Sequence, residues 1–276
     1  MPKADDRLPL AAAAAALIAA AVLFAPAMAW VAATWRVNPY YSHGPLVAVA
    51  AVILAWRAAK RLGPAAPSVA GLALVVLSVA AHALAARYAL WPASALALVG
   101  LLAGACLIVG GPAWLRAFAL PLALLALAIP LPWVAHIAPR LASAAAGQAA
   151  ALVGPLGVDV IHRGPQLIVG DGSFQVGAPC SGLRSIVALV TLAVGLAGTL
   201  HGPRARRWSL VALAVPLALV ANTVRLSGLL VVAEAFGTVP GLTYYHGLSS
   251  PVLFAAAVLG LLWMGRAMGC DVVAST

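Results

Sequence analysis

The sequence contains few charged residues and very few acidic ones. Charged side chains make up 8% of the 276 residues, and only 6 are Asp or Glu against 16 Lys or Arg. Hydrophobic residues make up 64%, and the mean hydropathy is +1.07. Such a chain has too little polar surface to cover a soluble globule. We therefore expect a polytopic membrane protein, in which the net charge of +10 comes from basic loops and not from a nucleic-acid-binding patch.

Cysteine is also scarce, and the usual motifs of metal and serine hydrolases are missing. Cys106, Cys180 and Cys270 lie in three different settings, with no CxxC or Cys/His spacing. Neither an HExxH motif nor a GxSxG nucleophile elbow occurs. We expect no disulfide framework, no metal and no cofactor.

Long apolar runs predict an all-α membrane fold with about eight transmembrane helices, because about 20 apolar residues cross a bilayer. The predicted spans are residues 8–33, 44–56, 69–86, 88–110, 117–131, 182–200, 208–232 and 251–264. The first run is too long for a cleaved signal peptide. The second is short, so a half-inserted segment is an alternative. We expect one integral membrane domain over residues 1–276, with residues 132–179 as an outer-side insert.

Basic residues predict the orientation of the spans. If the spans alternate, most of the Lys and Arg clusters fall on one side, which is then cytoplasmic because cytoplasmic loops are enriched in these residues. These clusters are Lys3 with Arg7, Arg57 with Lys60 and Arg61, Arg116, Arg204 with Arg206 and Arg207, and Arg266. Both termini are then predicted to be cytoplasmic, and Cys180 to lie outside.

The insert at residues 132–179 has its own predicted structure. Pro139 suits the first turn of a helix that reaches about Val153, and polar residues at helical spacing place this helix on the membrane surface. The β-prone runs 158–161, 166–169 and 173–176 are separated by turn sequences. They predict a small hairpin or three-stranded sheet that leads directly into Cys180.

Cys180 lies where the insert meets the next apolar run. A helix that begins near Ser181 would point its free N–H groups and positive dipole end at the thiol, and Arg184 would lie on the same face. Both effects would lower the pKa of the thiol and favour a reactive thiolate. The alternative is that Cys180 fills a packing gap, as we expect for Cys106 and Cys270.

Arg225 lies well inside a predicted span. A guanidinium there is tolerated when it faces a polar cavity or a partner. Asn222 lies three residues earlier on the same face and can orient it. The alternative is that Arg225 snorkels to the outer interface, which is close along the chain. We favour a functional role.

Two histidines lie in predicted outer loops. His246 follows Tyr244 and Tyr245 just before the last span, and His43 lies in the first outer loop. A histidine can act as a general acid or base near neutral pH, although most interfacial histidines are only solvated. A thiol that attacks a carbonyl, an arginine that stabilises the oxyanion and a histidine that serves the leaving amine would together perform acyl transfer.

Three segments carry a resemblance to a known family. They are Pro179-Cys180-Ser181-Gly182-Leu183-Arg184-Ser185, Asn222-Thr223-Val224-Arg225, and His246. In this order and at these helix ends, they resemble the motifs of the exosortase/archaeosortase family of integral membrane cysteine transpeptidases. Tyr41-Ser42-His43-Gly44 is similar to the first outer loop of that family. The resemblance extends from about residue 35 to 265.

The resemblance implies roles for single residues. Cys180, Arg225 and His246 match the positions proposed to be catalytic in the family. Arg184 and Asn222 lie in motif positions, as does His43, and we expect these residues to support the site.

The resemblance also implies a substrate class and a location. Exosortases act on secreted proteins that end in a short sorting motif, often Pro-Glu-Pro, followed by a hydrophobic span and a basic cluster. The expected partners are these proteins, membrane lipids and an unknown acceptor, and the expected location is the bacterial inner membrane. Cys180 would form a thioester with the substrate, release the tail and pass the protein to a cell-surface or exopolysaccharide-linked acceptor, or to water.

Two other classes of function stay open from the residues alone. A small transporter for an envelope precursor could use Asn222, Arg225 and the mid-span His82 to line its path. No matching pair of broken helices occurs in the two halves, however, and a transporter needs no thiol at a helix start. An assembly subunit of an envelope complex is the other alternative, and in that protein Cys180→Ala would be silent.

Overall fold

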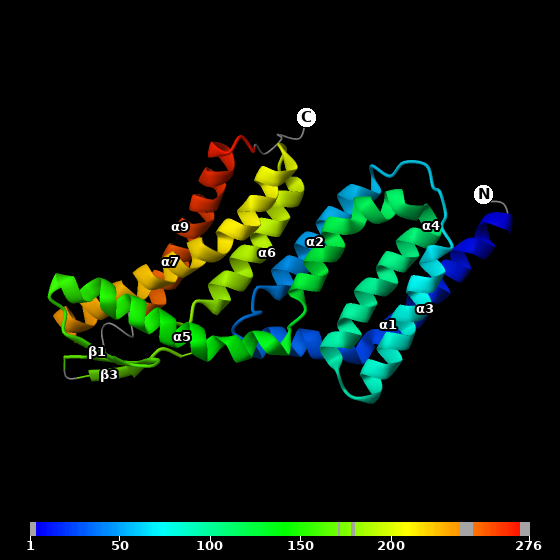
Figure 1. Ribbon diagram of the computed structural model, residues 1–276. Coiled ribbons are helices and arrows are strands. Elements are labelled where there is room, and N and C mark those ends of the chain that lie inside the picture. Colours follow the sequence, from blue (N-terminus) through cyan, green and yellow to red (C-terminus); the bar gives the residue numbers. More distant parts are fainter. Residues whose placement is uncertain (1–3, 171, 178–179, 238–244, 271–276) are drawn as a thin grey trace. The chain divides into compact units, whose positions relative to one another are not determined.

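The computed structural model describes residues 4–170, 172–177, 180–237 and 245–270, and the side chains of residues 4–14 and of His246 lie outside this description. The described helices are α1 (Ala4–Val37), α2 (Gly44–Ala59), α3 (Ala70–Arg87), α4 (Trp91–Ala128), α5 (Pro132–Val153), η1 (Gly154–Leu156), α6 (Leu183–Thr199), α7 (Arg204–Phe236) and α9 (His246–Ala267) (Figure 1). Five of them are long and apolar enough to cross a membrane, and α2 and α6 are shorter apolar helices. The predicted all-α membrane fold is confirmed.

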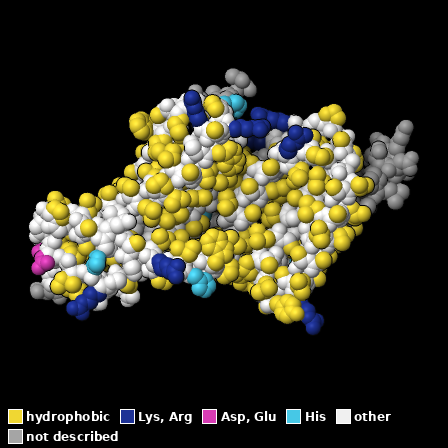
Figure 2. Space-filling view, in the orientation of Figure 1, with side chains coloured by type: hydrophobic (Ala, Val, Ile, Leu, Met, Phe, Trp, Pro, Cys, Tyr) yellow, Lys and Arg dark blue, Asp and Glu magenta, His cyan; other side chains and the backbone are white. Residues whose placement is uncertain are grey.

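The surface carries the apolar residues that a soluble protein would bury. Figure 2 shows hydrophobic side chains over much of the visible face. Large side chains such as Val52, Val76 and Trp263 are more than half exposed, at 65%, 57% and 70%. A surface of this kind is stable in lipid, where the helices satisfy their own backbone hydrogen bonds.

The chain forms two compact units. The N-terminal unit contains Met1–Val37 and Gly44–Pro130, and the C-terminal unit contains Asn38–His43 and Leu131–Thr276. The short segment between α1 and α2 therefore belongs to the C-terminal unit, although both flanking helices belong to the N-terminal one. The single membrane domain and the outer position of residues 132–179 stay predictions.

Helix α4 contains two of the predicted spans. Gly111 interrupts it with φ 73° and ψ −164°, and Pro112 follows directly. A Cβ atom at Gly111 would collide with the carbonyl oxygen of Ala66, so both the conformation and the space require glycine. The bend separates the predicted spans 88–110 and 117–131, and the number of apolar helices among the described residues is roughly consistent with the expected eight spans.

Small residues bring α3 and α4 together in the N-terminal unit. A Cβ atom at Gly71 would lie 2.6 Å from the carbonyl oxygen of Gly104, so these helices approach each other closely. The buried His82 Nδ1 is paired with Ser94 Oγ at 2.8 Å, and the His82 ring lies 4.1 Å from that of Phe24. This histidine joins two helices, and its contacts do not favour the transport path considered above.

A three-stranded antiparallel sheet precedes Cys180, as the sequence predicts. Its strands are β1 (Val160–Arg163), β2 (Gln166–Val169) and β3 (Gly172–Gln175), in the order β1-β2-β3. Val160 pairs with Val169, and Gln166 pairs with Gln175. The strand positions agree with the prediction within two residues.

The sheet is fixed to the helices by one apolar core. Leu167 and Val169 of β2 pack with alanines of α5 and with leucines of α7, and Cys180 packs against the edge of this cluster. Helix α5 begins at Pro132, two turns before the predicted start, and Pro139 lies inside it. The core therefore fixes the end of the insert against α7, where Asn222 and Arg225 lie.

A second core joins α6, α7 and α9. Leu189 of α6, Leu210 of α7 and Leu261 of α9 are almost fully buried in it. The three helices that carry the predicted catalytic residues are thus packed as one bundle within the C-terminal unit.

Candidate active site

A tight turn holds Cys180 at the start of α6. The Cys180 N–H donates to the carbonyl of Gly177 at 2.9 Å, and the Leu183 N–H donates to Ser181 Oγ at 3.3 Å. Gly182 is the residue before the helix and has φ 80° and ψ −11°, a left-handed conformation that glycine adopts without strain. The Cys-Ser-Gly sequence therefore forms the turn itself, with Cys180 partly exposed and Ser181 fully buried.

The turn lies directly on α7. A Cβ atom at Gly182 would lie 3.0 Å from the side-chain amide of Asn222, and Asn222 Nδ2 donates to the carbonyl oxygen of Cys180 at 3.1 Å. The conformation thus favours glycine at 182, and a side chain there would also crowd Asn222. Asn222 fixes the backbone of the cysteine, which is a more specific role than the supporting one predicted from sequence.

Arg225 is bonded on two sides. Its Nη2 donates to Asn222 Oδ1 at 2.8 Å, and its Nη1 donates to Ser250 Oγ of α9 at 2.8 Å. Arg225 is 8% exposed and Asn222 is 4% exposed. The guanidinium is therefore turned into the bundle, and the snorkelling alternative is wrong for this arrangement.

The resulting hydrogen-bond chain runs from the backbone of Cys180 through Asn222 and Arg225 to Ser250. It crosses three elements, namely the turn before α6, α7 and α9. A narrow cavity of about 20 Å³ lies beside it, which is room for about one water molecule. Its lining combines the polar chain with apolar residues of the bundle: Ser185, Leu189, Ala218, Ala221, Asn222, Arg225, Ser250, Leu253, Phe254 and Ala257.

Burial decides the acidity of the thiol. It raises the pKa of Cys180, and the positive charge of Arg225 acts in the opposite direction without overcoming it. The predicted lowering of the pKa is therefore wrong in sign, because the partly buried thiolate loses more hydration than the nearby charge returns. The cation that acts on the thiol is Arg225, whereas Arg184 is exposed. At neutral pH the resting thiol is protonated and needs a base.

The first loop also contributes to the C-terminal unit. Tyr40 and Tyr41 are buried, and the His43 ring is stacked near the Tyr41 ring with centroids 6.3 Å apart and planes at 14°. Burial lowers the pKa of His43, and the positive charge of Arg184 lowers it further. The structure thus brings His43 into the electrostatic range of Arg184, which is distant from it along the chain.

Tyr245 is a neighbour of this site that its sequence position does not reveal. The Tyr245 ring packs against the core that also contacts Cys180, and its hydroxyl lies where a Cβ of Gly228 on α7 would be. Burial raises the pKa of Tyr245, and the charge of Arg225 opposes that change. His246 is the first residue of α9, one turn before Ser250, and its side chain lies outside the described residues.

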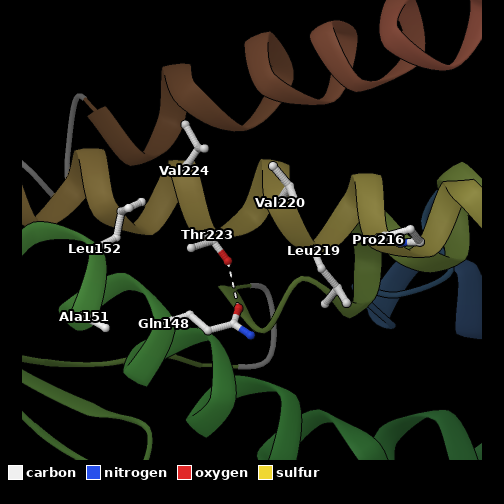
Figure 3. Close-up of a pocket in the computed structure, with 8 residues that line it drawn as sticks. All are labelled: Gln148, Ala151, Leu152, Pro216, Leu219, Val220, Thr223 and Val224. Carbon is white, nitrogen blue, oxygen red and sulfur yellow. Dashed lines mark hydrogen bonds between the residues drawn. The ribbon is translucent and has the colours of Figure 1, made fainter. Parts of the chain in front are cut away.

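A larger open groove lies between α5 and α7. It has a volume of about 650 Å³ and is lined mainly by apolar residues. Figure 3 shows Thr223 of α7 pointing toward Gln148 of α5, and the Thr223 hydroxyl donates to Gln148 Oε1 at 3.0 Å. The lining does not include Cys180 or Arg225. Among the described residues, no three His, Cys, Asp or Glu side chains gather as a metal site.

The family model described as "Transmembrane exosortase" matches residues 35–263. The chain belongs to the exosortase family. No curated protein and no solved structure matches it. As an exosortase, it is a multi-pass membrane protein of a family of transmembrane sorting enzymes, which act on membrane-associated proteins.

The structure brings together part of the predicted site of this exosortase. Cys180, Asn222 and Arg225 share one hydrogen-bond chain, and His43 and Arg184 interact electrostatically. Sequence reasoning missed Ser250, the second bonded partner of Arg225. The sequence could have indicated Ser250, because it follows His246 by four residues in α9 and therefore lies on the same helix face.

Proposed function

We propose that this exosortase is a membrane-embedded cysteine transpeptidase or protease, which removes C-terminal sorting tails from secreted proteins through a thioester on Cys180. The observation that carries the proposal is the chain Cys180–Asn222–Arg225–Ser250, which holds a buried cation beside a partly exposed thiol. Intramembrane charge of this kind is costly, and its usual reason is function.

The first step forms the thioester and releases the tail. His246 accepts the thiol proton, and the sulfur of Cys180 attacks the scissile carbonyl carbon. Arg225 stabilises the resulting oxyanion. The C–N bond then breaks, His246 returns the proton to the departing amine, and the tail leaves with a new amino terminus. The protonated resting state of Cys180 supports the need for this base.

The second step transfers the protein to an acceptor. An acceptor nucleophile attacks the thioester carbonyl and loses its proton to His246, and the C–S bond breaks to restore the thiol. We propose a cell-surface or exopolysaccharide-linked acceptor. Water in the same role would make the enzyme a hydrolase.

Exposed basic residues of the C-terminal unit suit the recognition of an acidic motif. We propose that Arg184 and Arg140, both exposed and both in the C-terminal unit, receive the glutamate of a Pro-Glu-Pro motif. Arg184→Ala would then weaken processing of a Glu-containing tail more than that of a Gln-containing tail. Equal loss for both tails would contradict this contact.

We propose that the enzyme lies in the bacterial inner membrane, with both termini in the cytoplasm and Cys180 on the outer side. The distribution of basic residues over the predicted loops supports this orientation. A phosphatase or fluorescent-protein fusion at each terminus measures the orientation directly, and termini on opposite sides would contradict it.

The experiment that tests the function is mass spectrometry of a reporter with a Pro-Glu-Pro motif, a hydrophobic span and a basic end. The reporter is co-expressed with the wild type or with Cys180→Ala. We expect the tail to be lost only with the wild type, and the mass of the new C-terminus separates hydrolysis from transfer. Equal processing in both cells would contradict a cysteine enzyme.

A further inference from the structure

His43 lies in a segment that is held firmly in the C-terminal unit. The segment Asn38–His43 is anchored by Tyr40 and Tyr41, which are 5% and 3% exposed. Gly44 then begins α2, and the ring of Trp35 occupies the space that a side chain at Gly44 would need. His43 thus lies two residues after an anchored pair and directly before a position restricted to glycine. Its place in the fold is well defined.

The His43 side chain has an unmet need for hydrogen bonds. Both ring nitrogens are buried, and in the described part of the chain neither has a partner. Buried polar side-chain atoms in folded proteins are normally bonded, because an unbonded one loses its hydration with no return. His82, a buried histidine of the N-terminal unit, follows this rule through its bond to Ser94. His43 therefore contributes nothing to stability through its polar atoms.

The residues around His43 indicate which chemical group it can bind. Arg184 adds a positive charge that disfavours a second cation, so the imidazole is neutral, with one N–H donor and one acceptor nitrogen. A main-chain N–H offers the donor that the unprotonated ring nitrogen needs. A carboxylate offers acceptors only, and it suits the guanidinium of Arg184 better. The residue as a whole is partly exposed, and contact with a substrate would require its ring to rotate until a nitrogen reaches the surface.

We propose that His43 is a substrate-binding residue whose unprotonated ring nitrogen accepts a hydrogen bond from the main-chain N–H of the glutamate of the sorting motif, near Arg184. This inference rests on the proposed function. Within Pro-Glu-Pro, the glutamate carries the one backbone N–H, because proline has none. His43 then holds the main chain of the motif, and Arg184 holds its acidic side chain.

The test measures binding separately from cleavage. The enzyme with Cys180→Ala is placed in lipid nanodiscs, and the affinity of a fluorescent peptide with the Pro-Glu-Pro motif and its hydrophobic span is measured. We expect His43→Leu to weaken binding about tenfold, the equivalent of one hydrogen bond. His43→Asn, whose amide keeps a donor and an acceptor, should recover at least about half of that free energy. The matched control is His136→Leu, which removes an exposed histidine of the same unit.

A second peptide identifies the contacted group. N-methylation of the glutamate removes its N–H, and it should weaken binding to the enzyme with His43 about as much as His43→Leu does. The same methylation should have little effect on the His43→Leu protein, because the two changes remove one interaction. Independent losses from the two changes would contradict the contact, as would unchanged binding by His43→Leu.

The two proposals fail in different ways. If the wild type does not cleave the tailed reporter, the proposed function is wrong. If the wild type cleaves it but His43→Leu binds the peptide as tightly as the protein with His43, only the role of His43 is wrong. Unchanged thermal melting of His43→Leu, and unchanged alkylation of Cys180 in the chain that retains it, exclude a folding defect as the cause of weaker binding.

Discussion

The two units bury polar residues in different ways. In the N-terminal unit, buried His82 and Ser94 satisfy each other and join neighbouring helices. In the C-terminal unit, buried Asn222 and Arg225 extend a hydrogen-bond chain from the backbone of a cysteine to Ser250. The first arrangement is a closed pair between two helices, whereas the second contains the charge of Arg225 near a thiol. Buried polar residues in a membrane protein thus indicate an active site when their hydrogen bonds hold a charged side chain near a reactive group.

The largest expected effect separates the two partly exposed cysteines. Cys180→Ala should lower the rate of tail cleavage at least about a thousandfold, because it removes the nucleophile. Cys106→Ala, in α4 of the N-terminal unit, should leave the rate unchanged. Cleavage of the reporter by the purified proteins measures both. Similar losses in the two variants would show that the loss reflects folding and not chemistry.

Arg225 should give the next largest effect. Arg225→Ala removes the cation at the thiol, and we expect kcat to fall about 100-fold to 1,000-fold, as for the loss of an oxyanion donor. Arg225→Lys keeps the charge but cannot make both guanidinium hydrogen bonds, so its kcat should lie between that of the wild type and that of Arg225→Ala. Steady-state kinetics in nanodiscs measures this series. Arg163→Ala on the exposed β1 is the matched control, and an equal loss in it would contradict a special role for Arg225.

A pair of serines tests the comparison between the units more finely. Ser250→Ala removes one of the bonds that orient Arg225, and we expect about a tenfold lower kcat with little change in melting temperature. Ser94→Ala leaves the buried His82 without its partner, and it should cost about 1–3 kcal/mol of stability while kcat is retained. Kinetics and thermal melting of both variants are required. A loss of stability without loss of kcat in Ser250→Ala, together with a loss of kcat in Ser94→Ala, would contradict the distinction between an active-site bond and a structural helix contact.

The smallest expected effect concerns the pH dependence of the thiol. Burial favours the neutral form, so the pKa of Cys180 is raised and its alkylation should begin at higher pH than in a free peptide of residues 177–185. Arg225→Ala should move the midpoint higher still, by up to about one pH unit, because it removes a charge that stabilises the thiolate. Alkylation by an uncharged reagent, in a chain with Cys106→Ala and Cys270→Ala, measures the midpoint. A midpoint of alkylation below that of the peptide would instead support the sequence-based prediction of a lowered pKa for Cys180.

Much of the fold could be predicted because it depends on local patterns. The apolar runs and the turn sequences around Gly164 and Gly170 follow periodicity and glycine chemistry, and they predicted the helices and the sheet. The start of α5 was predicted less well. The prediction from Pro139 placed the helix start too late, because Pro132 also suits a first turn and the helix begins there.

The site was predictable only where one helix determines it. The spacing of Asn222 and Arg225 predicted their contact, since residues three apart share a face. Ser250 was missed because its partner comes from another helix. The pKa of Cys180 was predicted with the wrong sign because spacing along α6 says nothing of burial, which depends on the packing of α5, α7 and the sheet.

The central claim is that Cys180 forms a covalent bond to the substrate, and trapping that bond tests it most directly. Wild-type enzyme is mixed with the tailed reporter, quenched in acid within the first turnover and analysed by peptide mass spectrometry. The account predicts that the peptide with Cys180 gains the mass of the cleaved reporter fragment less one water, and that hydroxylamine removes this addition. Cleavage of the tail with an unmodified Cys180, together with full activity of Cys180→Ala, would contradict the account.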